Sequence, residues 1–185
     1  DGLVELMGGR DAFIGKLDSL FTADSKLEGE STSVDISGLI GQYAHGNEPS
    51  HHIAHLYNYV GQPWRTQEIV DKVLHTLYFN NPDGLSGNED CGQMSAWYIL
   101  NAMGFYQVCP GKPVYSIGRP LFNEATVHLK DGKSFKVIAH NNSRDNKYVR
   151  SIVLNGNKLE TPFFTHQDIV DGGTLELTMG SEPLK

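Results

Sequence analysis

The sequence predicts an α+β chain in which a helical region comes first and a strand-rich region follows. In residues 1–112, apolar side chains recur at helical spacing between loops rich in Gly, Asn and Pro, whereas residues 113–185 alternate between apolar and polar side chains. Helices followed by a run of strands indicate two packed layers of different kinds rather than an alternating α/β sheet. We therefore predict two regions, residues 1–112 and residues 113–185.

Four helices are expected in the first region. They cover residues 10–21, residues 49 to about 60, residues 63–77 and residues 93 to about 102, and a proline opens the second and the third. Gly104 follows the last helix as a C-terminal cap. The stretches 22–41 and 78–91 are longer than the roughly 2–8 residues that usually connect bundled helices. Long polar loops of this kind are common places for binding residues.

Five strands are expected in the second region, and most of them should be antiparallel. They cover residues 113–118, 125–130, 134–140, 148–154 and 174–179. Asp131-Gly132 and Asn155-Gly156 lie between alternating segments and are typical hairpin turns.

Composition excludes several classes of function. The 185 residues carry a net charge of −7, which disfavours binding to nucleic acid or to anionic lipid. No apolar run approaches the roughly 20 residues of a membrane-spanning helix. The sequence begins with Asp1 and no signal peptide, so we expect a mature or trimmed piece. Cys91 and Cys109 could form a disulfide, although two small buried thiols are the simpler expectation.

The first loop with candidate chemistry is residues 42–55, which hold half of the eight histidines. Asn47 and Glu48 offer adjacent oxygen donors just before a predicted helix, and such donors suit a hard cation such as Ca²⁺. His51 and His55 are four residues apart, which is also a zinc-ligand spacing, but the metalloprotease pattern H-E-x-x-H is absent. A purely structural alternative is that Asn47 caps the helix and the histidines pack against neighbours.

The second loop is residues 82–98, where Asn88, Glu89 and Asp90 stand at a loop-to-helix junction. A carboxylate there could activate a water molecule as a general base. Alternatively Asp90, three residues before Gln93, could form a capping box. Trp97 could stack on a sugar, although such a residue is more often part of the core.

Both loops resemble signature segments of glycoside hydrolase family 92, the calcium-dependent exo-acting α-mannosidases. The resemblance lies in residues 45–52 (HGNEPSHH) and 87–98 (GNEDCGQMSAWY), and it extends to residues 1–9 (DGLVELMGG) and 148–156 (YVRSIVLNG). It implies that residues 1–112 are the C-terminal part of a helical (α/α)6 barrel. It also implies that residues 113–185 form an antiparallel, β-sandwich-like region.

The resemblance implies specific roles for several residues. Asp90 matches the general base of an inverting hydrolase, and Asn88 stands where many relatives have a second Asp. Asn47 and Glu48 match the calcium-binding segment. His45, Glu48 and Trp97 are then expected to contact the substrate, which would be a terminal α-mannoside of glycans such as N-glycans, with the α-1,2 linkage expected.

The family pattern also implies a larger parent enzyme. Its general acid is expected upstream of residue 1, together with an N-terminal β-sandwich and the remaining barrel helices, so the 185 residues alone should be nearly inactive. The expected location is periplasmic, outer-surface or secreted. Two other functions remain open on the sequence alone: a non-catalytic carbohydrate-binding or structural module, and a zinc hydrolase that uses His45, His51 and His55.

Overall fold

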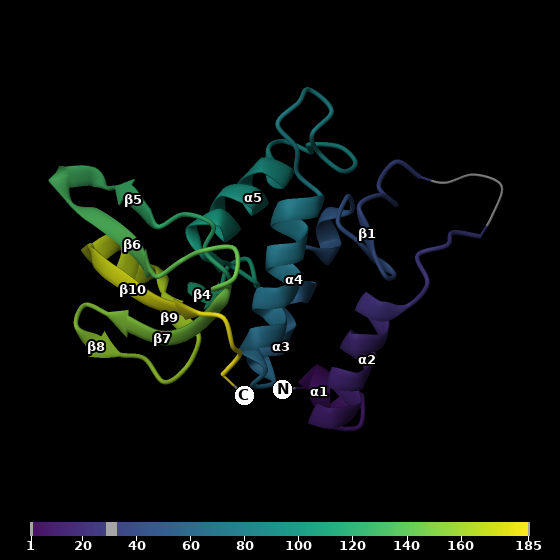
Figure 1. Ribbon diagram of the computed structural model, residues 1–185, viewed down its shortest axis with the longest axis horizontal. Coiled ribbons are helices and arrows are strands. Elements are labelled where there is room, and N and C mark those ends of the chain that lie inside the picture. Colours follow the sequence, from purple (N-terminus) through teal and green to yellow (C-terminus); the bar gives the residue numbers. More distant parts are fainter. Residues whose placement is uncertain (1, 29–32, 185) are drawn as a thin grey trace.

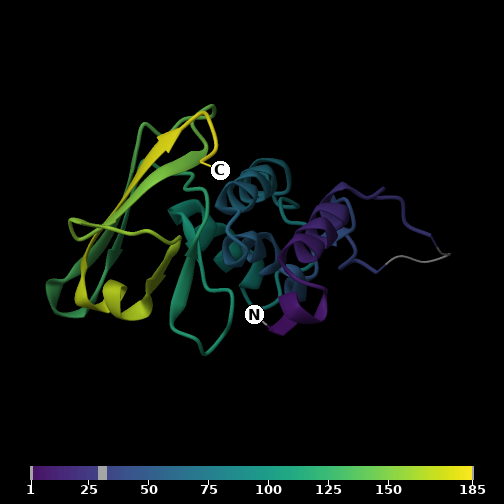
Figure 2. The ribbon, with the colours of Figure 1, turned by 90° about the horizontal axis from the view of Figure 1, so that it is seen from below.

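The computed structural model describes residues 2–28 and 33–184. The helical region contains α1 (Gly2–Leu6), α2 (Arg10–Thr22), the short strands β1 (Leu39–Ile40) and β2 (Tyr43–Ala44), the 3-10 turns η1 (Glu48–Ser50) and η2 (Ile53–His55), and the helices α3 (Leu56–Tyr59), α4 (Pro63–Thr76) and α5 (Gln93–Met103). Figure 1 shows α4 and α5 in the middle of the molecule, with α2 on one side and the large sheet on the other. Figure 2 shows the same order of layers from below.

The strand-rich part of the chain contains two sheets and begins with β3, just before residue 113. Its elements are β3 (Phe105–Tyr106), β4 (Val114–Ile117), β5 (Glu124–His128), the turn η3 (Lys130–Gly132), β6 (Ser134–His140), β7 (Tyr148–Leu154), β8 (Asn157–Lys158), β9 (Phe163–Thr165), the helix α6 (His166–Asp171) and β10 (Gly173–Gly180). The larger sheet has the strand order β5-β6-β10-β7-β8, and the smaller has the order β3-β4-β9. The α+β fold class is therefore confirmed.

Three of the four predicted helices are confirmed, as α2, α4 and α5. Gly104 ends α5 with a φ of 104°, and its N–H donates to the carbonyls of Leu100 and Asn101. This left-handed conformation favours glycine over other residues. The two predicted hairpins are also present, since β5 pairs with β6 and β7 with β8 in antiparallel register.

The continuous helix predicted for residues 49–60 is wrong. The segment instead forms η1, η2 and the single turn α3. Side chains elsewhere in the chain take the carbonyls that a regular α-helix would use: Trp97 Nε1 donates to the His51 carbonyl at 3.0 Å, and Thr66 Oγ1 donates to the Ala54 carbonyl at 2.9 Å. His51 and His55 consequently do not share an α-helical face.

The larger sheet is mixed rather than purely antiparallel. β10 runs antiparallel to β7 but parallel to β6, with Leu175 opposite both Leu154 and Val137. The six-residue helix α6 was not predicted, although a capping box between Thr165 and Asp168 marks its start.

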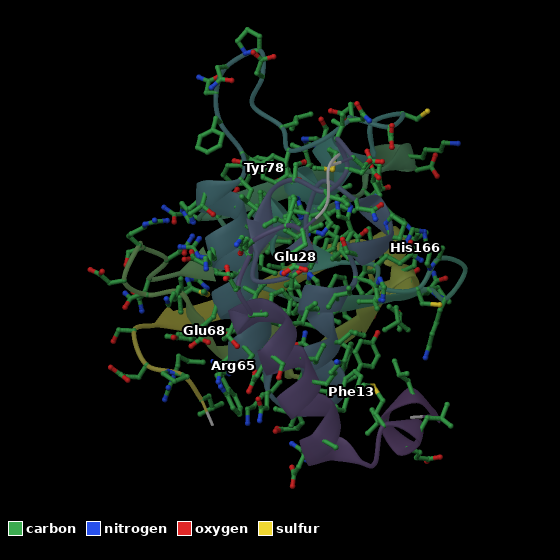
Figure 3. All side chains as sticks on the ribbon, turned by 90° about the vertical axis from the view of Figure 1, so that its right-hand side faces the viewer. Phe13, Glu28, Arg65, Glu68, Tyr78 and His166 are labelled. Atoms are coloured by element: carbon green, nitrogen blue, oxygen red, sulfur yellow. The ribbon has the colours of Figure 1, made fainter. Side chains whose placement is uncertain are left out.

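Two hydrophobic cores meet on α5. Trp97 belongs to the core of the helical region, whereas Leu100 and Met103 pack against the core of the sheets. Polar bonds also join the regions: Tyr148 Oη donates to Glu68 Oε1 at 2.8 Å, and Glu68 lies beside Arg65 on α4 (Figure 3). The domain boundary at residue 112 and the barrel and sandwich assignments stay predictions.

Candidate active site

The two loops singled out by sequence lie against each other, main chain to main chain. A Cβ atom at Gly87 would lie 2.7 Å from the Gly46 carbonyl oxygen, and one at Gly46 would collide with Ser37 Oγ. Gly87 also has a φ of 76°, a region that L side chains rarely adopt. Glycine at both positions therefore allows the loops around Glu48 and Asp90 to approach closely.

A third loop, residues 33–38, completes this arrangement. The N–H groups of His45 and Gly46 donate to the carbonyls of Gly38 and Ser37, each at 3.1 Å. This loop brings Asp35 to the site, where Asn88 Nδ2 donates to Asp35 Oδ1 at 3.2 Å. Asp35 was not predicted individually, although it lies in the long loop 22–41 that the sequence marks as a place for binding residues.

Glu48 is the most perturbed carboxylic acid of the site. Its own backbone N–H lowers the pKa of the carboxyl group, but burial and the neighbouring carboxyl groups of Asp90 and Asp35 together raise that pKa. Glu48 Oε1 is buried, and no described protein atom hydrogen-bonds to it. A buried oxygen in this state is costly unless a proton or a cation satisfies it.

Asp90 has a strained backbone and an exposed side chain. Asp90, Cys91 and Gly92 all have positive φ, at 44°, 60° and 88°. Successive left-handed residues other than glycine cost energy, and such strain is concentrated at functional sites.

The capping alternative for Asp90 is wrong. The residue at the N-cap position of α5 is Gly92, which offers no side chain. The Glu89 carboxylate instead accepts from Ser95 N at 3.0 Å and from Ser95 Oγ at 2.9 Å. Glu89 thus satisfies the helix terminus, and the Asp90 carboxylate is left for other interactions.

The capping alternative for Asn47 is likewise not supported. Asn47 precedes η1 in an extended conformation and makes no side-chain capping bond. Its side chain is exposed next to Glu48. Two oxygen donors therefore stand together at the start of η1, as the sequence indicated.

His45 and Trp97 lie behind the site rather than on its surface. Both are 0% exposed, so neither ring offers a face to a ligand in this structure. Their burial favours the alternative in which Trp97 is a core residue, and it opposes their expected contact with the substrate. The two rings meet edge to face, with centroids 4.5 Å apart.

The protonation of His45 follows from its partners. Tyr78 Oη donates to the Met94 carbonyl at 3.0 Å, so it accepts from His45 Nε2 at 2.7 Å, and His45 Nδ1 accepts from Tyr43 Oη at 2.8 Å. Burial first, and then His51, lowers the pKa of His45 to about 3, so the ring is neutral. Tyr78, at the base of the projecting loop in Figure 3, is thereby tied to the loop that carries Glu48.

The zinc alternative is not supported by the histidine geometry. His51 Nε2 contacts the His45 carbonyl at 3.0 Å and His51 Nδ1 accepts from Gln93 at 3.2 Å. His55 is held by Ser116 and Asn101, and burial lowers its pKa to about 4. The ring nitrogens that a zinc ion would need are thus already used. Within residues 2–28 and 33–184, no three His, Cys, Asp or Glu side chains form a metal-binding group.

The residues present do fit part of a calcium site. Ca²⁺ prefers oxygen ligands, and the unpartnered Glu48 Oε1 beside Asn47 offers two of them. Ca²⁺ takes about 6–8 oxygen ligands, so carbonyls, water, substrate hydroxyls or other segments would supply the remainder.

A hollow of 450 Å³ opens beside Glu48. Its walls include His52, Gln93, Tyr106 and Gln107, and its volume falls within the roughly 300–1,000 Å³ typical of small-ligand sites.

Cys91 and Cys109 are both exposed and unpaired, so the expectation of buried thiols is wrong.

Comparison with known proteins identifies the family. The family model for the glycosyl hydrolase family 92 catalytic domain matches residues 1–181. The chain therefore belongs to glycosyl hydrolase family 92, as the two loop motifs indicated.

Particular relatives support this assignment. A family 92 α-mannosidase from Bacteroides thetaiotaomicron, solved with mannoimidazole, is 43% identical, with a TM-score of 0.89 over 95% of this chain and 23% of its own. A family 92 inverting mannosidase from the same organism is also 43% identical, with a TM-score of 0.83 over 98% of this chain and 26% of its own. An uncharacterised secreted glycosidase of Arthroderma benhamiae is 31% identical over 97% of this chain and 21% of its length. The chain thus spans about a quarter of these relatives.

Proposed function

We propose that the protein is an exo-acting, inverting, calcium-dependent α-mannosidase, and that this chain supplies the base side and the cation side of its active site. The observation that carries the proposal is the pairing of Glu48 with Asp90: one carboxyl has a buried oxygen without a partner, and the other is exposed and free of capping bonds. Family membership and two mannosidase neighbours support the choice of substrate.

In this mechanism Asp90 is the general base. An inverting glycosidase needs a carboxylate that removes a proton from water while the water attacks the anomeric carbon. The Asp90 side chain is exposed, and it lies in the same loop as Asn88, so its carboxylate can hold that water. Asn88 cannot remove a proton, but its amide oxygen can accept a hydrogen bond from the water or a sugar hydroxyl.

Asn47 and Glu48 would hold the calcium ion. When bound there, the ion would offer its charge and open coordination positions to hydroxyl groups of a sugar. Asn47 and Glu48 both lie at the start of η1. The buried His45 and Trp97 support their loop from behind.

The general acid is proposed to lie in another part of the longer catalytic domain. Mannose-containing glycans are the proposed substrates, with α-1,2-linked terminal residues of N-glycans expected. A secreted or periplasmic location is proposed, and the Arthroderma benhamiae relative, described as a secreted glycosidase, supports it. Among the described residues, no helix has both the length and the apolar character to cross a membrane.

The test is hydrolysis by the protein that carries this chain. Mannobioses with α-1,2, α-1,3, α-1,4 and α-1,6 linkages are offered with calcium and with a chelator, and proton NMR follows the first-formed anomer. We expect the α-1,2 substrate to yield β-mannose first and the chelator to abolish turnover. Initial release of α-mannose, or full activity with the chelator, would overturn the mechanism. Binding of mannosides without hydrolysis would favour a carbohydrate-binding module.

The 185 residues on their own should show little turnover of unactivated mannosides. General acid catalysis typically contributes about 10²–10⁴-fold, and the chain without its acid would lose that contribution. Robust turnover by the isolated chain would place the general acid within residues 1–185.

A further inference from the structure

Asp35 is the carboxylate of the site to which the proposed mechanism gives no role. Its loop is fixed by main-chain contacts: Ser37 and Gly38 accept the N–H groups of Gly46 and His45, and a Cβ at Gly46 would lie 3.1 Å from the Asp35 carbonyl oxygen. The position of Asp35 therefore does not depend on its own side chain. The Asp35 carboxylate is therefore available to accept hydrogen bonds from neighbouring side chains.

What faces Asp35 is the Asn88 side chain, with Nδ2 at 3.2 Å from Asp35 Oδ1. An ionised carboxylate can only accept hydrogen bonds, so the NH₂ group of Asn88 must be the end directed at it. The other carboxylate oxygen of Asp35 accepts from Ser33 Oγ at 3.4 Å. Asp35 thereby binds the NH₂ end of the Asn88 amide and leaves Asn88 Oδ1 as the available acceptor.

The orientation matters because Asn88 lies two residues before Asp90. A free asparagine can rotate by half a turn and exchange its donor and acceptor ends at little cost. If the NH₂ end faced the attacking water, it would donate to the water and occupy a lone pair that must attack the sugar. With the oxygen end available, Asn88 and Asp90 both accept from the same water, and its lone pair stays free.

We propose that Asp35 is a positioning residue that fixes the Asn88 amide as the hydrogen-bond acceptor beside the general base. This role rests on the proposed mannosidase function, because it concerns the water that Asp90 activates. It also explains why an amide suits position 88 in this chain: a carboxylate there would face Asp35 with the same charge at 3.2 Å.

A double-mutant cycle tests the proposal on the protein that carries this chain. The variants are Asp35→Asn, Asn88→Asp and the double exchange, each measured by thermal melting and by kcat and KM on a mannobiose. Asp35→Asn should lower kcat, by up to about 10²-fold, because the amide at position 88 is no longer oriented, with little change in KM or melting temperature. Asn88→Asp should lower both kcat and the melting temperature, because two carboxylates then face each other.

The double exchange should recover much of the melting temperature and part of kcat. The amide introduced at position 35 can then donate to the carboxylate introduced at position 88, which restores the hydrogen bond with its polarity reversed. Asp131→Asn is the matched control, since it removes the same charge in the β5–β6 turn and should change neither quantity. An Asp35→Asn enzyme with normal kcat would overturn the positioning role.

The melting data and the kinetic data separate two kinds of failure. Additive melting shifts across the cycle would show that Asp35 and Asn88 do not interact, and would overturn the proposal even if the enzyme is a mannosidase. If the wild-type protein hydrolysed no mannoside, the proposed function and the role of Asp35 in it would both be wrong. Coupled melting shifts would then still confirm the contact itself.

Discussion

Glu89→Ala should lower the melting temperature, whereas Asp90→Asn at the neighbouring position should leave it nearly unchanged. Glu89→Ala removes the acceptor for Ser95 N and Ser95 Oγ at the start of α5. Loss of a helix cap costs about 0.5–2 kcal/mol, and because these bonds are exposed we expect a value near 1 kcal/mol. For a domain of 150–250 residues, 1 kcal/mol corresponds to roughly 2–4 °C in melting temperature.

Asp90→Asn should leave the melting temperature nearly unchanged. The Asp90 side chain does not cap α5, and asparagine tolerates the left-handed backbone at φ 44° about as well as aspartate does. The assay is differential scanning fluorimetry of both variants, with Glu89→Gln as a control that keeps an acceptor oxygen and loses only the charge. A larger melting shift for Asp90→Asn than for Glu89→Ala would refute the assignment of Glu89 as the cap.

Two further predictions concern calcium and pH. Glu48→Gln weakens a charged ligand, so half-maximal activity should require more calcium, and a calcium titration should restore part of the turnover; a defect insensitive to calcium would contradict a role of Glu48 as a ligand. Burial lowers the pKa of His45 to about 3 and of His55 to about 4, so the unfolded chain binds more protons than the folded chain below the usual histidine pKa of about 6.5. The stability that these residues contribute should be complete above pH 6.5 and should decrease toward pH 4. A melting temperature that stays the same between pH 7 and pH 4 would contradict this prediction.

Much of the fold could be predicted because local patterns decide it. The apolar spacing of α2, α4 and α5 and the alternation of the main strands are properties of neighbouring residues. The second predicted helix failed for a non-local reason, since Trp97 and Thr66 take carbonyls that regular helix bonds would use. The parallel pairing of β10 with β6 depends in the same way on topology rather than on sequence pattern.

The candidate site was predicted in part. Polar loops with adjacent oxygen donors indicated Asn47, Glu48 and Asp90, and the structure brings Glu48 and Asp90 together. The capping spacing favoured Asp90 over Glu89, but three left-handed residues place Glu89 at the helix terminus instead. Asp35 could not be singled out because no motif surrounds it, and only the main-chain contacts of its loop bring it to Asn88.

The central claim is that Asp90 is the general base, and the most direct test is kcat/KM of Asp90→Asn on a mannobiose in the protein that carries this chain. The amide keeps the shape of the side chain but cannot remove a proton from water. We predict a loss of about 10²–10⁴-fold, with calcium dependence and melting temperature close to those of the wild type. Near-normal turnover by Asp90→Asn would contradict the assignment and would leave the general base to another residue.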